Sequence, residues 1–102
     1  MPNAKEALLE VLREARALLA LSDNDFAWST WDSAADALSE LDSFISNIEG
    51  GRNFDGLELS ILFAPTGDIQ EVSLSSGWGQ EFCRVAESFD SAFTNYEKTR
   101  SA

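Results

Sequence analysis

Carboxylates are the most numerous side chains in this sequence that could do chemistry, and four of them recur at helical spacing. Asp25, Asp32, Asp36 and Glu40 would share one face of a helix. Like charges at this spacing repel one another, and no basic residue in the same stretch relieves the repulsion. The row suits three roles: a contact with a basic partner, a site for Mg²⁺ or Mn²⁺, or an ordinary solvated face.

The residues that are missing restrict the chemistry further. The chain has no histidine, which removes Ser-His-Asp and Cys-His nucleophiles, histidine acid–base catalysis and nearly all zinc sites. Its one cysteine, Cys83, follows the expected core position Phe82 and is predicted to be a buried, inert thiol. No glycine-rich phosphate loop occurs. We therefore expect no catalytic residue, cofactor or metal, and a carboxylate-only metal-dependent hydrolase is the one enzymatic alternative.

The formal net charge of −11 points to a class of partner. Nucleic acids and anionic membranes are bound by clustered Lys and Arg, so neither is expected to bind here. No basic residue lies between Arg16 and Arg52, whereas that stretch holds seven acids and so carries −7 of the −11. A block of one sign favours a basic protein partner, although solubility alone is an alternative explanation.

Two tryptophans are candidate contact residues beside these acids. Trp28 is flanked by carboxylates, and Trp78 lies between Gly77 and Gly79. A rigid aromatic ring among acidic residues would make a strong binding anchor. The alternative for Trp28 and Trp78, and also for the third tryptophan, Trp31, is packing in the core. The predicted partner-binding residues are Asp25, Trp28, Asp32, Asp36, Glu40 and Trp78.

The chain of 102 residues is expected to form a single domain, residues 1–102. Apolar residues at helical spacing predict a helix over 4–21, capped by Asn3. A turn at 22–25 leads to a second helix over 25–49. Its apolar stripe runs from Ala27 through Trp31 to Ile48, and Gly50 ends the helix. A last helix is predicted over 80–98.

Between the second and last helices, apolar residues alternate with polar ones. This period predicts strands over 57–63 and 69–75, joined as a β-hairpin by the turn 64–68. The expected fold is therefore α+β, in the order ααββα, with the helices packed on one face of a two-stranded ribbon. The open edges of such a ribbon leave a homodimer with a continuous sheet as an alternative to a monomer.

Together these features predict a small acidic protein-binding module that docks on a basic surface. In size, charge and lack of catalytic residues the chain resembles the immunity and antitoxin proteins of bacteria, a likeness that no motif carries. Replacing Asp32 and Asp36 together by Lys should then weaken partner binding more than tenfold. An oligomeric scaffold or adaptor that associates through the hairpin edge is the alternative. The lone cysteine, and the lack of a secretory signal or membrane-spanning stretch, predict a cytoplasmic location.

Overall fold

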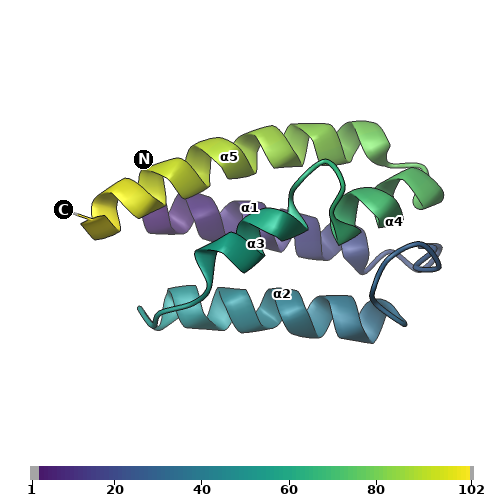
Figure 1. Cartoon of the computed structure of the whole chain (residues 1–102), viewed down its shortest axis with the longest axis horizontal. Helices are drawn as coiled ribbons and strands as arrows, with labels where there is room; N and C mark the ends of the chain where they lie inside the picture. The colour runs from purple at the N-terminus through teal and green to yellow at the C-terminus, as the bar shows by residue number, and fades with distance from the viewer. Residues whose placement is uncertain (1–2, 102) are drawn as a thin grey trace.

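The computed structural model describes residues 3–101, and its regular structure there is entirely helical. The helices are α1 (Ala4–Leu19), α2 (Ala34–Glu49), α3 (Gly56–Leu62), α4 (Asp68–Ser76) and α5 (Gly79–Ser101). The three long helices α1, α2 and α5 run along the 41 Å axis of the molecule, and α1 packs against both of the others (Figure 1). The short helix α4 packs on the beginning of α5, and α3 lies beside α2 and α5.

The predicted α+β fold is wrong. Residues 57–63 and 69–75 fall largely in α3 and α4, and no strand occurs between residues 3 and 101. The order ααββα, the ribbon and the homodimer built on its edges are therefore discarded. The first and last predicted helices correspond closely to α1 and α5.

Helix α3 forms because a cap and an apolar triplet outweigh the alternating pattern. Asp55 accepts a hydrogen bond from the backbone N of Glu58 at 3.1 Å, which satisfies one of the free N–H groups of the first turn. Leu59, Leu62 and Phe63 are three and four residues apart and are buried together. Leu57 and Ile61, which the strand pattern placed in the core, are instead exposed.

Helix α4 is defined by the turns at its two ends. It begins after Gly67, where a Cβ would lie 2.8 Å from the carbonyl oxygen of Leu62, so the α3–α4 turn requires glycine. It ends at Gly77, which has the left-handed φ of 87°. The backbone N of Trp78 then donates to the carbonyl oxygen of Ser73 at 3.0 Å, which closes the turn into α5.

The predicted start of the second helix at residue 25 is also wrong, because α2 begins at Ala34. Residues 20–33 form a loop instead of a short turn. Polar side chains there bond to the backbone: Asp25 Oδ1 accepts from the N of Ala27 at 2.9 Å, and Ser29 Oγ donates to the carbonyl of Phe26 at 2.9 Å. Such local bonds compete with the helical ladder, so the apolar stripe alone does not extend the helix.

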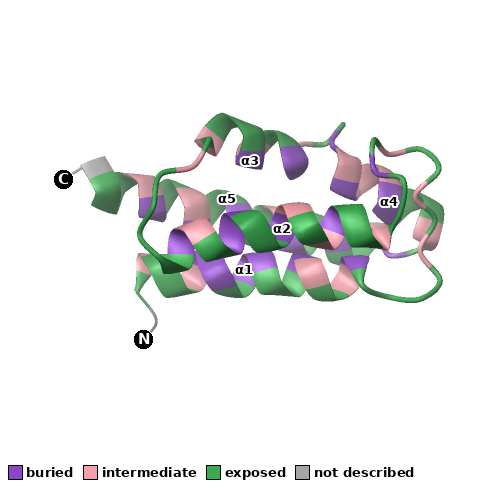
Figure 2. Cartoon of the chain, turned by 90° about the horizontal axis from the view of Figure 1, so that it is seen from below, coloured by how far each residue is buried: buried purple, intermediate pink, exposed green. Residues whose placement is uncertain are grey.

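One continuous apolar core holds the helices together (Figure 2). Leu8, Leu12 and Leu19 of α1 are fully buried, as their helical spacing predicts. Beneath α3, the rings of Phe63 and Phe89 stack with their centroids 4.0 Å apart, and Phe93 stacks on Phe89 at 5.2 Å. The aromatic stack therefore joins the end of α3 to α5, and the aliphatic core of α1 packs between α2 and α5.

Ion pairs on the surface connect α1 to its neighbours. Arg13 pairs with Glu49, and Arg84 of α5 lies 3.7 Å from Glu14. Arg16 donates two hydrogen bonds to Asp42, at 2.6 and 3.1 Å. These hydrogen bonds lower the pKa of the Asp42 carboxyl, an effect that its partial loss of hydration opposes and the charge of Arg16 reinforces.

Asp42 should therefore make folding more favourable only while its carboxyl is charged. Its pKa is lower in the folded than in the unfolded chain, so its contribution is present above about pH 4 and disappears as pH falls through the folded-state pKa. We expect Asp42→Asn to lower the urea midpoint at pH 7 and to have a progressively smaller effect as the pH falls below about 4. Glu10→Gln corrects for the change in net charge. An effect that does not shrink as the pH falls would contradict the pairing.

Within residues 3–101, no helix combines the length and apolar composition needed to cross a bilayer.

Candidate functional site

The four acids expected on one helix face lie in two different settings. Asp25 and Asp32 belong to the α1–α2 loop, whereas Asp36 and Glu40 lie in the first half of α2. Asp25 and Asp32 line a common hollow of about 570 Å³ in the loop. Asp36 adjoins it, since its Oδ2 accepts a hydrogen bond from the backbone N of Asp32 at 3.1 Å. Glu40 does not line this hollow.

Glu40 has a structural partner. Its Oε2 accepts a hydrogen bond at 2.7 Å from Nε1 of Trp31, whose side chain is buried. A buried indole N–H needs such a partner, so this bond anchors the end of the loop to α2. Glu40 is thereby committed to the fold, and its partner, Trp31, is a core residue.

The three tryptophans divide clearly between core and surface. Trp28 is 74% exposed on the loop, whereas Trp31 and Trp78 are each 6% exposed. Nε1 of Trp78 donates to Oδ1 of Asn24 at 2.8 Å, so that ring packs inside the fold and holds the loop. Trp28 is therefore the one predicted aromatic contact whose ring is available to another molecule.

The loop that presents Trp28 is held along its length. Asn24 donates to the carbonyl of Leu18 in α1 at 2.8 Å, and the backbone N of Asp25 donates to Oγ of Ser76 in α4 at 2.8 Å. Two residues beyond Trp28, Thr30 donates to Asp68 from both its backbone N, at 3.0 Å, and its hydroxyl, at 2.5 Å. Helices α1 and α4 thus fix the loop on both sides of the exposed ring.

We call the group formed by Asp25, Trp28, Asp32 and Asp36 the acidic loop surface. All four side chains are exposed, and no carboxylate in the group forms an ion pair with any residue in the range 3–101. It lies at the end of the bundle where α1 leads into the loop and α4 leads into α5 (Figure 1).

The basic residues lie elsewhere in the molecule. Lys5, Arg52, Lys98 and Arg100 lie toward the opposite end, near the beginning of α1 and the end of α5 (Figure 1). Arg16 and Arg84 lie closer to the acidic loop surface, but they already form ion pairs with Asp42 and Glu14. The acidic loop surface therefore keeps its negative charge.

This arrangement does not assemble a metal site. Across the described chain, no group of three or more Asp, Glu or Cys side chains has a geometry that could hold a metal ion. The carboxylates of the loop point to hydrogen-bonded backbone or to solvent instead of converging. Residues 3–101 therefore contain no metal site of the kind that the magnesium or manganese hydrolase considered from the sequence would need.

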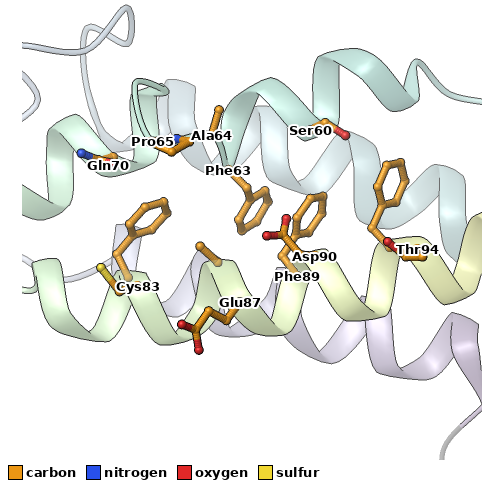
Figure 3. A pocket seen from close by; sticks show the side chains of 13 residues that line it. Ser60, Phe63, Ala64, Pro65, Gln70, Cys83, Glu87, Phe89, Asp90 and Thr94 are labelled. Carbon is orange, nitrogen blue, oxygen red and sulfur yellow. The ribbon is translucent and has the colours of Figure 1, made fainter.

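Sequence reasoning missed a second feature, an apolar groove between α5 and the α3–α4 turn (Figure 3). Cys83, expected to be buried, is exposed and lines this groove, as does Asp90. The exposed residues Leu57 and Ile61 lie on α3 nearby. The capping pattern of Asp55 and Glu58 was the signal that could have identified α3 as a helix and these residues as its outer face.

Because comparisons with known proteins found no match, the function has to be inferred from the fold and from these two surfaces. No family model matches the chain, and no match was found among the curated proteins or the solved structures. The chain is thus described by its own geometry, as an all-helical protein with an acidic loop at one end.

Proposed function

We propose that this protein is an acidic protein-binding module that docks on a basic surface of a partner through the acidic loop surface. The observation that carries the proposal is the 74% exposure of Trp28 on a hydrogen-bonded loop, among carboxylates that form no ion pair within residues 3–101. Aromatic anchors of this kind dominate many protein interfaces, and an ordered loop loses little conformational entropy on binding.

Each element of the surface has a distinct part in the proposed contact. The ring of Trp28 supplies apolar area, while the carboxylates of Asp25 and Asp32 meet Lys or Arg on the partner. An inhibitor or an immunity- or antitoxin-type protein would act in this way, by covering a cationic functional surface. We place this activity in the cytoplasm, in keeping with the single free cysteine.

The test begins by isolating the partner. Wild-type protein is immobilised and incubated with lysate of the source cell at low salt. A basic protein that high salt then releases is identified and purified. We expect Trp28→Ala and Asp32→Lys each to raise its Kd more than tenfold, because one removes the anchor and the other reverses a charge. Asp32 is preferred to the pair Asp32 and Asp36, since the side chain of Asp36 also holds the loop backbone at Asp32 against the first turn of α2.

Matched variants separate a specific contact from general charge effects. Leu74→Ala removes another exposed apolar side chain, 62% exposed on α4, and Glu10→Lys makes an equal charge reversal on α1. Both should bind within about twofold of wild type. A partner bound equally well by Trp28→Ala and Asp32→Lys would refute the proposed surface. A partner held regardless of salt would favour a scaffold or adaptor role instead.

A further inference from the structure

The groove between α5 and the α3–α4 turn is a second surface, separate from the acidic loop surface. It has a volume of about 660 Å³. Phe63, Ala64 and Pro65 line it on the side of the turn, and Phe82, Ala86 and Phe89 line it on the side of α5 (Figure 3). Its lining is predominantly apolar, which is typical of a site that binds apolar groups.

The groove is long, and two exposed apolar residues lie on α3, which borders it. Its lining on α5 extends from Phe82 to Thr94, which corresponds to about 18 Å at 1.5 Å per residue. On α3, Ser60 lines the groove, and Leu57, three residues before it on the same helix face, is 72% exposed. Ile61, one turn beyond Leu57, is 56% exposed. A surface of this length suits a segment of polypeptide better than a compact small molecule.

The charged side chains that line the groove determine which sign of charge its occupant should carry. Asp90 lies near the middle of the groove, beside Phe63 and Phe89, and Glu87 lies on the α5 edge with its carboxylate turned away from α3 (Figure 3). Asp90 has no hydrogen-bond or ion-pair partner between residues 3 and 101, and the lining includes no Lys or Arg. A cationic group would therefore be attracted to Asp90, and an anionic one repelled.

We propose that this groove binds an amphipathic cationic segment of a partner protein. Large apolar side chains of the segment lie against the phenylalanine rings and against Leu57 and Ile61, and a Lys or Arg of the segment pairs with Asp90. The proposal goes beyond the function assigned to the acidic loop surface, since the two surfaces share no residue.

The single cysteine provides a local readout. Cys83 is exposed and lines the groove, so an occupant should shield its thiol from a thiol reagent such as Ellman's reagent. The probe is a synthetic amphipathic Leu/Lys peptide of about 12 residues, the number that spans about 18 Å as a helix. The comparison peptide has the same composition in scrambled order. We expect the amphipathic peptide to bind at least tenfold more tightly than the scrambled one and to slow Cys83 modification at least fivefold.

Variants locate the binding within the molecule. Ala86→Phe fills the groove and should weaken the amphipathic peptide at least tenfold, whereas Ala17→Phe, the same change on the exposed face of α1, should have little effect. Asp90→Asn should weaken binding more than Glu10→Gln, which changes the net charge equally. Trp28→Ala should leave peptide binding unchanged, so this test stands or fails separately from that of the acidic loop surface. Circular dichroism confirms that each variant is folded.

Three results would overturn the proposal. The first is equal binding of the amphipathic and scrambled peptides, which would show attraction by net charge alone. The second is a Cys83 thiol that reacts at the same rate with saturating peptide. The third is protection of Cys83 that increases with protein concentration in the absence of peptide, which would make a second copy of this chain the occupant.

Discussion

Trp78→Ala is expected to lower the free energy of unfolding by about 3–5 kcal/mol, the range for truncating a large buried aromatic side chain. Trp78 is 6% exposed, and its Nε1 donates to Asn24, which in turn donates to the carbonyl of Leu18. The substitution thus removes core volume and breaks the connection from the start of α5 through the loop to α1. Urea unfolding followed by far-UV circular dichroism measures the loss.

The chain contains its own controls for this experiment. Trp28→Ala removes the same side chain from an exposed position and should change stability by no more than about 0.5 kcal/mol. Trp78→Phe keeps most of the ring and removes the N–H donor, which should cost about 1 kcal/mol. Equal, small effects of Trp78→Ala and Trp28→Ala would contradict the buried position of Trp78 and restore it as a contact residue.

Phe89→Ala should be similarly destabilising, again by about 3–5 kcal/mol. Phe89 is 2% exposed and its ring lies between those of Phe63 and Phe93. Its removal leaves a cavity below α3, a short helix that packs on the bundle chiefly through Leu59, Leu62 and Phe63. Total stabilities of small domains are about 5–15 kcal/mol, so this variant would be near its unfolding threshold.

The effect of Phe89→Ala is measured by thermal and urea unfolding. Thr94→Ala, an exposed change farther along α5, serves as the reference and should stay within about 0.5 kcal/mol of wild type. Phe89→Leu should lose less than Phe89→Ala because it fills part of the cavity. A loss below 1 kcal/mol for Phe89→Ala would show that the aromatic stack contributes little to holding α3 in place.

The sequence predicts α1, α5 and the end of α2 well because each has a clear periodic signal and a clear boundary, whereas the predicted start of α2 is nine residues too early. Asn3 caps α1 as expected, with its Oδ1 2.8 Å from the backbone N of Glu6, and Gly50 follows the end of α2. The short segments were ambiguous. Residues 57–63 satisfy both a two-residue alternation and a helical triplet, and only the cap at Asp55 distinguishes them. The β-hairpin prediction gave weight to the alternation alone.

The candidate site was predictable in composition but not in geometry. The sequence shows an acidic block around Trp28, yet the late start of α2 moves Asp25 and Asp32 off the helix. The exposure of Trp28 and the burial of Trp78 depend on tertiary contacts, among them the bond of Thr30 to Asp68 across distant parts of the chain. The groove could not be predicted at all, because its two walls belong to segments that the sequence analysis placed in a strand pair and a separate helix.

The separation of charge along the molecule gives it a permanent dipole moment. Carboxylates without basic neighbours gather at the end that carries the α1–α2 loop, and most basic residues lie toward the other end of a body 41 Å long. The electric field of a cationic partner would turn the molecule so that Trp28 faces that partner before any atoms touch. This torque fades over a Debye length of about 8 Å at physiological salt, so ionic strength would act mainly on the rate of association.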